Sequence, residues 1–260
     1  MLAAQRRELI LTEIEREGSV TVSALARMLD VSEMTVRRDL DALDSEGFLN
    51  KVHGGATSTR SVRGREVGFT AKALLAEAQK RAIAKAAAQM VEPGAVVGLS
   101  AGTTTYLIAQ ELLGMRGITV ITNGIRIADV FSETSPSDIQ VIMTGGSRTV
   151  SDALVGPLAL ASLRDLNTDF FFMGVHGMDE QAGFTAPNLS EAETNRALAG
   201  TARQFVVVAD SSKWGEVGLA RITSLDEATV LITDDGIPEG TRQTLNTHIP
   251  KVVYTKPELD

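Results

Sequence analysis

Short polar turns rich in glycine and threonine follow several apolar, strand-like segments in the larger, C-terminal part of this chain. The first turn, 100–105, reads Ser-Ala-Gly-Thr-Thr-Thr and opens a helical stretch. Backbone N–H groups, the positive end of a helix dipole and threonine hydroxyls would converge there, which suits a phosphate dianion. A small phosphorylated ligand is therefore the simplest occupant.

Comparable turns follow other predicted strands, and the carboxyl ends of parallel strands meet at the edge of a sheet where ligands bind. Each turn taken alone is equally well explained as ordinary turn structure, but several converging turns favour a binding crevice. A lysine after one strand could neutralise a phosphate or simply lie on the surface. The residues that these patterns place at the crevice are Ser100, Gly102, Thr103, Thr104, Thr105, Asn123, Gly145, Gly146 and Lys213.

Signatures of nucleotide cofactors and metal sites are missing from the sequence. Residues 98–102 do not match G-x-G-x-x-G, and no Gly-Lys-Ser/Thr follows a glycine-rich loop, so NAD and ATP are disfavoured. The three histidines lack metal-ligand spacing, and the absence of cysteine removes thiolate ligands, disulfides and cysteine nucleophiles. We therefore expect no cofactor, no metal and no catalytic residue.

A second set of candidate residues lies in a helical stretch near the N-terminus, 33–45. At 100° per residue, Leu40 and Leu43 fall within about 40° of Val36, so these three residues face a core. When such a helix occupies a major groove, its outward side chains reach bases and its flanks reach phosphates. The outward residues are Met34 and Arg38, and the flanking residues are Thr35 and Arg37.

Two shorter helical patterns precede this stretch. The first pairs Ile10 with Ile14 on one face, and the second is expected to begin with Ser23 as its N-cap. A turn of two residues, 30–31, then leads to Ser32, a strong N-cap for the third helix. Helices joined by so short a turn must cross steeply, which is the geometry of a helix-turn-helix.

A basic hairpin is predicted after the third helix, which Gly47 ends. From Phe48 to Arg65 the only charged side chains are Lys51, Arg60, Arg63 and Arg65. The hairpin is therefore expected to act as a wing that contacts phosphates. The residues expected to contact double-stranded operator DNA are Ser32, Met34, Thr35, Arg37, Arg38, Lys51, His53 and Gly54.

The overall charge leaves an alternative open for this N-terminal region. The chain has a formal net charge of −8, which argues against non-specific coating of nucleic acid but not against a focal basic patch. Residues 1–60 hold eight Lys or Arg and ten Asp or Glu, and winged helices also serve as protein-interaction modules. The positive charges are concentrated at Arg37, Arg38 and the wing, and this uneven distribution favours DNA over a protein as the partner.

These motifs together resemble the DeoR family of bacterial transcriptional regulators over nearly the whole chain. In the N-terminal region the resemblance rests on Thr35-Val36-Arg37-Arg38-Asp39-Leu40, Leu43, Gly47 and Lys51-Val52-His53-Gly54-Gly55-Ala56. In the remainder it rests on Gly102-Thr103-Thr104-Thr105, Val120-Ile121-Thr122-Asn123, Gly145-Gly146, Val155-Gly156, Glu191-Ala192 and Ala209-Asp210-Ser211-Ser212-Lys213.

The resemblance implies a sensor domain with a fold like that of ribose-5-phosphate isomerase and the CoA transferases. A phosphorylated sugar or polyol would change the affinity for operator DNA, and Glu191 would belong to the effector site. Ser100 stands where many members carry Asp, and Asn195 where a lysine is common. These two departures leave the identity of the sugar open.

Length and patterning predict two domains of the α/β class. The 260 residues exceed one ordinary domain, and 43% hydrophobic with 22% charged residues is typical of a globular chain. We expect a winged helix-turn-helix domain at 1–57, a linker at 58–70 and a sensor domain at 71–260. Strands are predicted at 95–99, 118–122, 139–144, 169–175, 204–209 and 228–233, and helices at 71–90, 105–113, 125–132 and 191–202. This alternation predicts a parallel, two-faced sheet.

The leading hypothesis is a cytoplasmic repressor of a carbohydrate operon, released from its operator by a phosphorylated sugar or polyol. No apolar run is long enough to span a membrane. Operator symmetry predicts a homodimer, and a homotetramer is also open. The alternative is a sugar-phosphate isomerase with an appended DNA module, for which Asp179, Glu180 and Glu191 are available as acids or bases. The sequence leaves the sugar, the operator and the sign of regulation undecided.

Overall fold

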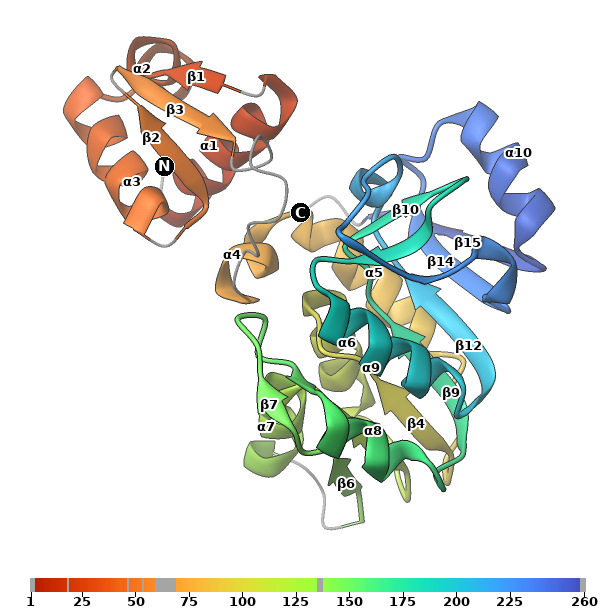
Figure 1. Ribbon diagram of the computed structural model, residues 1–260. Coiled ribbons are helices and arrows are strands. Elements are labelled where there is room, and N and C mark those ends of the chain that lie inside the picture. The colour runs from red at the N-terminus through yellow and green to blue at the C-terminus, as the bar shows by residue number, and fades with distance from the viewer. Residues whose placement is uncertain are drawn as a thin grey trace. The chain divides into compact units, whose positions relative to one another are not determined.

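The chain divides into two compact units, residues 1–75 and 76–260 (Figure 1). The first unit has one apolar core and the second has two. The computed structural model describes residues 3–17, 19–45, 47–52, 54–58, 69–134 and 138–257. Most of the basic linker predicted above, including Arg60, Arg63 and Arg65, lies outside these residues, as does His53.

The N-terminal unit packs three helices on a three-stranded antiparallel sheet. Its elements are α1 (Ala3–Glu17), β1 (Ser19–Thr21), α2 (Val22–Leu29), α3 (Glu33–Ser45), β2 (Leu49–Val52) and β3 (Gly55–Ser58). The predicted hairpin is confirmed by the pairing of β2 with β3, and β1 adds to the other side of β3. Gly55 permits this approach, because a Cβ there would lie 2.0 Å from the carbonyl oxygen of Val20. Helices α2 and α3 form the helix-turn-helix, and the β2–β3 hairpin is its wing.

Polar residues begin the second and third helices of this unit. The hydroxyl of Ser32 accepts a hydrogen bond at 3.2 Å from the N–H three residues later, so the predicted N-cap of α3 is confirmed. The prediction that Ser23 caps α2 is wrong. Thr21 is the N-cap instead, since α2 already begins at Val22, and its hydroxyl accepts from the N–H of Ala24 at 3.2 Å.

The C-terminal unit is built on a seven-stranded parallel sheet with the order β15-β14-β12-β9-β4-β5-β6. Its strands are β4 (Val96–Leu99), β5 (Thr119–Thr122), β6 (Gln140–Met143), β9 (Thr168–Met173), β12 (Ala202–Val208), β14 (Val230–Asp234) and β15 (Lys251–Thr255). The six predicted strands and their parallel direction are confirmed, and β15 is additional. In chain order the strands run outward from β4 to β6, then return to β9 and continue the other way. The strand order therefore reverses between β4 and β9.

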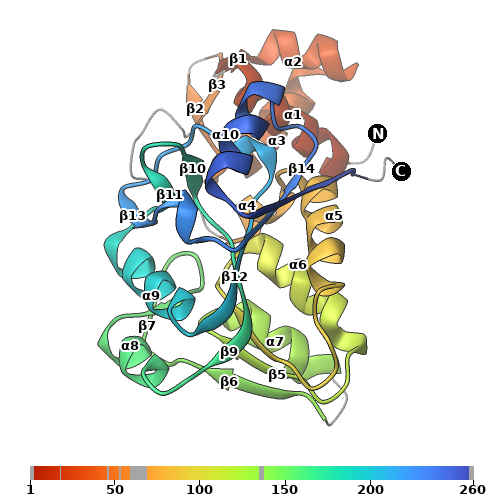
Figure 2. The same cartoon turned by 90° about the vertical axis from the view of Figure 1, so that its right-hand side faces the viewer.

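Helices cover both faces of this sheet and give it two apolar cores (Figure 2). Helices α5 (Glu77–Ala88), α6 (Thr103–Glu111) and α7 (Ile125–Thr134) lie on one face, and α8 (Pro157–Leu163), α9 (Leu189–Ala199) and α10 (Glu239–His248) contribute to the other core. Along β12, Val206 and Val208 enter the first core and Val207 the second, because successive strand side chains point to opposite faces. Shorter strands β7 (Ser147–Arg148), β8 (Leu154–Val155), β10 (Gly177–Asp179), β11 (Gly183–Ala186) and β13 (Ala220–Thr223) form two small antiparallel sheets.

The predicted single helix over 71–90 is wrong. The chain forms α4 (Phe69–Leu74) and then α5, separated by Leu75 and Ala76. Ala76 has φ +51°, in the left-handed region, and this conformation ends one helix and starts the next. Alanine gives no sequence signal for such a break.

Among the described residues, no helix combines the length and the apolar character needed to cross a membrane.

Candidate functional site

The third helix presents its predicted outward face to solvent. Val36, Leu40 and Leu43 are fully buried in the core of the N-terminal unit, as the helical period predicts. Met34 is 62% exposed, and Arg38 is exposed with no ion pair in the described part of the chain. The guanidinium of Arg38 can therefore contact a base, since arginine forms two hydrogen bonds with guanine in the major groove.

The flank of α3 nearest the hairpin carries cations that are paired with exposed carboxylates. Arg37 contacts Glu33 at 3.3 Å, and the ammonium of Lys51 contacts Asp41. The backbone N–H of Lys51 also donates to Asp44 at 2.9 Å, which ties the hairpin to the helix. Exposed ion pairs contribute little stability, so both cations can turn towards phosphates. An open cleft between helix and hairpin is lined by Arg37, Asp44, Lys51, Val52 and Gly54.

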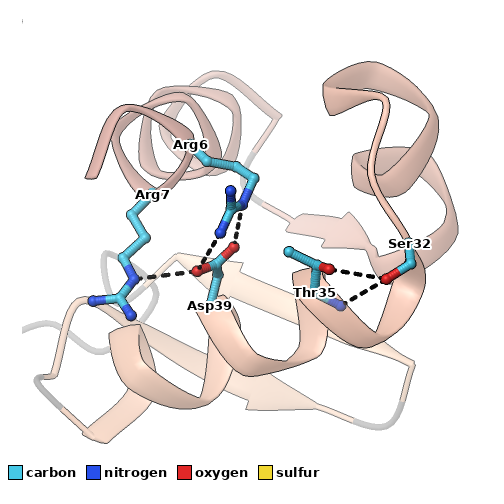
Figure 3. Close-up of polar contacts among 5 residues, drawn as sticks. All are labelled: Arg6, Arg7, Ser32, Thr35 and Asp39. Atoms are coloured by element: carbon cyan, nitrogen blue, oxygen red, sulfur yellow. Dashed lines mark hydrogen bonds and ion pairs between the residues drawn. The ribbon is translucent and has the colours of Figure 1, made fainter. Parts of the chain in front are cut away.

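The opposite flank of α3 contains a contact that the sequence did not suggest. Asp39 is 3% exposed and accepts hydrogen bonds from Arg6 and Arg7 of α1 (Figure 3). Ser32 and Thr35, on the same flank, bond to each other through their hydroxyls at 2.9 Å. On the helical wheel Asp39 lies about 60° from Val36, at the border of the core face. This position at the edge of the core face is the one feature of the sequence that could have indicated a buried carboxylate.

In the C-terminal unit, the turns after β4, β5 and β9 meet at the carboxyl edge of the sheet. The hydroxyl of Ser100 accepts from the N–H of Gly174 at 3.0 Å, which links the turns on either side of the strand reversal. The side chain of Asn123 accepts from the N–H of Ala101 at 2.8 Å and donates to the carbonyl of Leu154 at 3.2 Å. Both side chains are buried, and they hold the neighbouring turns together.

The turn after β4 leads into the N-terminus of α6 without a side-chain cap. Gly102 is the N-cap residue, and in the described part of the chain it leaves the first turn without a side-chain cap hydrogen bond. Thr105 is fully buried and donates to the carbonyl of Ser100 at 2.6 Å, so its hydroxyl supports the turn. Thr103 is half-buried and Thr104 is 7% exposed. Uncapped N–H groups at a helix start form an anion site.

The turn after β6 and the loop between β7 and β8 lie beside the turn after β5, since the carbonyl of Asn123 accepts from the N–H of Leu154 at 2.7 Å. Gly145 and Gly146 have φ of +68° and +116°, and a Cβ on Gly146 would lie 2.4 Å from the carbonyl oxygen of Val155. Glycine is therefore required there. In the loop, Thr149 donates to the carboxylate of Glu191 at 2.8 Å, and Glu191 is 8% exposed at the start of α9.

Two arginines that the sequence analysis did not select meet one carboxylate beside this loop. Asp152 accepts from Arg126 at 2.8 Å and from Arg148 at 2.7 Å. Burial raises the pKa of Asp152, but the hydrogen bonds from Arg126 and Arg148 outweigh it, and the net pKa lies below the ordinary value. Asp152 has φ +59°, and its carbonyl accepts from Ile125 at the start of α7. The carboxylate therefore holds both arginines beside the start of α7 and the β7–β8 loop.

Lys213 lies further along the same edge, after β12. It ends a short 3-10 helix, Ser211–Lys213, that Asp210 caps through the N–H of Ser212. Asp234 accepts from the N–H of Ser211 at 2.6 Å and fixes the turn from the neighbouring strand. Lys213 is half-buried, and the hydrogen bonds of the described residues do not connect it to the turns after β4, β5 and β6.

A buried lysine, Lys80, was also missed by the sequence analysis. It is 3% exposed and lies in the first turn of α5. Because α5 leads through a short connection into β4, its N-terminal end points to the carboxyl edge of the sheet, as the N-terminus of α6 does (Figure 2). Lysine is rarely this buried unless it is paired, and Lys80 does have a partner within the protein.

Together these features define a winged helix joined to an α/β unit in which several polar turns meet at the carboxyl edge of the sheet. Sequence comparison gives the same division. The DeoR-like helix-turn-helix domain matches residues 6–62, and the DeoR C terminal sensor domain matches residues 76–235. The chain belongs to the DeoR family and is a DNA-binding transcriptional regulator.

Relatives match over nearly the full length of the chain. The HTH-type transcriptional regulator YgbI of Escherichia coli K12 is 37% identical, over 94% of this chain and 95% of its own. The lactose phosphotransferase system repressor of Staphylococcus aureus is 31% identical over 95% and 98%, and the glycerol-3-phosphate regulon repressor of Haemophilus influenzae is 28% identical over 97% of each chain. Among solved structures, ribose 5-phosphate isomerase A of Methanocaldococcus jannaschii is 20% identical and covers 52% of this chain and 53% of its own, with a TM-score of 0.39.

Proposed function

We propose that this protein represses a carbohydrate-utilisation operon and releases its operator when a phosphorylated sugar or polyol occupies the crevice. It would act in the cytoplasm, where operator DNA lies. The observation that carries the effector proposal is the uncapped N-terminus of α6 at the reversal of strand order. Ligands of doubly wound sheets bind at this reversal, and uncapped N–H groups suit phosphate oxygens.

In the proposed complex, side chains and backbone have separate roles. The first-turn N–H groups and hydroxyls of Thr103 and Thr104 donate to the phosphate, and Lys213 adds positive charge. Glu191 accepts from a sugar hydroxyl, as it already accepts from Thr149. Ser100, Thr105 and Asn123 are engaged by backbone groups and act by holding the turns in place. Gly102, Gly145 and Gly146 let the backbone approach the ligand.

The names of two relatives support this class of regulation. One is a repressor of a glycerol-3-phosphate regulon and another is a repressor of a lactose phosphotransferase system. We extend from them to this chain the sign of regulation, which is repression, and the chemical class of the effector, which is a phosphorylated polyol or sugar.

We propose that the C-terminal unit is a sensor and not an isomerase. Isomerisation needs a carboxylate base placed at the substrate. Asp179 instead accepts from the N–H groups of Gln181 and Ala182 at 2.9 and 2.8 Å, so its carboxylate holds the β10–β11 turn. Glu180 is exposed. Conversion of ribose 5-phosphate to ribulose 5-phosphate at high protein concentration would contradict this proposal.

Thermal unfolding against a panel of ligands tests the effector proposal. The panel contains glycerol 3-phosphate, hexose 1- and 6-phosphates, ribose 5-phosphate, inorganic phosphate and the unphosphorylated polyol and sugars. A ligand that binds only the folded state raises its stability, by about 2.7 kcal/mol at a hundred times Kd. We expect at least one phosphorylated compound to raise Tm and to release operator DNA, and its unphosphorylated counterpart to do neither. Stabilisation without release would mean that the crevice does not regulate.

We further propose that the protein binds its operator as a homodimer or homotetramer. One reading helix contacts only part of a turn of DNA, and a second copy supplies a second half-site and more phosphate contacts. Light scattering of the protein alone and on operator DNA gives the number of copies. One copy per operator would contradict the proposal.

A further inference from the structure

The buried carboxylate of Asp39 lies next to the most outward residue of the reading helix. Arg38 points to solvent, Leu40 is fully buried in the core, and Asp39 lies between them with 3% exposure. A buried carboxylate needs cationic partners. Arg6 and Arg7 provide them from α1, 33 and 32 residues earlier in the chain (Figure 3).

The hydrogen bonds from Arg6 and Arg7 to Asp39 constrain the orientation of these side chains as well as their distance. Arg6 uses two nitrogens on the two oxygens of Asp39, with Nε to Oδ2 at 2.5 Å and Nη2 to Oδ1 at 3.2 Å. Arg7 adds a third contact, from Nε to Oδ1 at 3.3 Å. The paired contacts of a planar guanidinium with a carboxylate fix both distance and orientation. The apolar contacts of the α3 core face are non-directional by comparison.

We propose that Asp39 is a positioning residue for DNA recognition. By engaging Arg6, it fixes the rotation of α3 about its own axis against α1, and this rotation decides whether Arg38 and Met34 face the base edges. The proposal rests on the assignment of α3 as the reading helix.

Because Asp39 is negatively charged, an electrostatic role and a positioning role predict opposite changes in DNA affinity when it is replaced. Asp39→Asn removes one negative charge, and electrostatics alone would strengthen binding to every DNA sequence. The positioning role predicts the opposite for the operator. Glu8→Gln is the matched control, because Glu8 is exposed on α1 and the change in net charge is the same. We expect Glu8→Gln to bind all DNA as well as the unaltered protein or slightly better.

A second variant distinguishes a loss of helix positioning from a loss of folding. Asp39→Asn leaves Arg6 without its carboxylate, and the domain could unfold. Arg6→Lys keeps the charge balance but replaces the planar fork with a single ammonium. We expect it to remain folded and to keep its non-specific affinity, while the ratio of operator to non-specific affinity falls about tenfold or more, which is the scale of one misplaced base contact.

The experiment uses the full chain and two duplexes of equal length: an operator fragment selected from a random-sequence library, and an unselected random duplex. Affinities are measured at several salt concentrations, and circular dichroism and stoichiometric titration give the folded and active fractions. A lower operator ratio in folded Arg6→Lys, and in Asp39→Asn where it folds, supports the proposal. An unchanged ratio in folded Arg6→Lys overturns it, whatever the stability. Arg38→Ala is measured in parallel, and unaltered base preference in that variant would show that the assignment of the reading helix itself is wrong.

Discussion

The proposed reading helix and the proposed effector crevice use their polar residues differently. On α3, Arg38 and Met34 are exposed and make no contribution to the core. At the crevice, Ser100, Thr105 and Asn123 are buried and bonded to the backbone of neighbouring turns. DNA is a large ligand outside the protein and is read by side chains that protrude. A small anion is held by backbone N–H groups, so side chains are needed mainly to arrange the turns.

This difference predicts that substitutions on α3 change affinity with little effect on stability, whereas substitutions under the crevice change both. The exception in the N-terminal unit is Asp39, which is buried and bonded like the crevice residues although it lies on the reading helix.

The largest effect is expected from Thr103→Glu. Thr103 is half-buried in the first turn of α6. The helix dipole stabilises a carboxylate at this end of a helix, so we expect the variant to fold. The same carboxylate repels a phosphate in a partly desolvated site. Effector binding should be lost, and the variant should stay on its operator when effector is added. Gln110→Glu, at the exposed far end of α6, is the control for charge. Normal release in Thr103→Glu would place the effector elsewhere.

Arg38→Ala should weaken operator binding by roughly 1–3 kcal/mol, about 5- to 150-fold, and relax base preference without lowering Tm. Lys51→Ala is the comparison, because a phosphate contact carries no sequence information. It should weaken binding to all sequences alike and reduce the salt slope by about one. Filter-binding or anisotropy titrations against operator variants distinguish the two. Equal losses on all sequences for Arg38→Ala would contradict a base contact.

Asn123→Ala should lower the free energy of unfolding by about 1–3 kcal/mol. The substitution leaves the N–H of Ala101 and the carbonyl of Leu154 without a partner at a buried site. Urea denaturation measures this loss, and effector affinity should fall as well because two turns are released. A variant with unaltered stability but no effector binding would mean that Asn123 contacts the ligand directly, and the comparison between the two sites would be weaker.

The smallest effect is expected from Asp152→Asn and depends on pH. Asparagine tolerates the left-handed φ of this position. Burial opposes ionisation of Asp152, but the contacts with Arg126 and Arg148 lower its pKa overall. Its charge therefore contributes stability above the ordinary aspartate pKa of about 3.9, and this contribution is lost as the pH falls through the lower, folded value. Unfolding free energies at pH 7 and pH 3 should differ less in Asp152→Asn than in the unaltered protein. Identical differences would show that the arginines do not stabilise the carboxylate.

Sequence periodicity determined the local part of this structure. The 3.6-residue period placed Val36, Leu40 and Leu43 in the core, and apolar runs predicted six strands of the parallel sheet. These features follow from which side chains must leave water, and a linear pattern records that directly. The turns after the strands were found for the same reason, since small and polar residues mark them, and Ser100 and Asn123 do lie at the carboxyl edge.

Only the tertiary structure decided which buried polar groups meet. Arg6 and Asp39 are separated by 33 residues, and Thr149 and Glu191 by 42. Nothing in the sequence near one partner specifies the other, because a carboxylate accepts from any donor that packing brings within reach. The break at Ala76 and the addition of β1 to the hairpin have the same origin. Local pattern gives each helix and strand its buried face, and the packing of those faces then decides which charges must compensate one another.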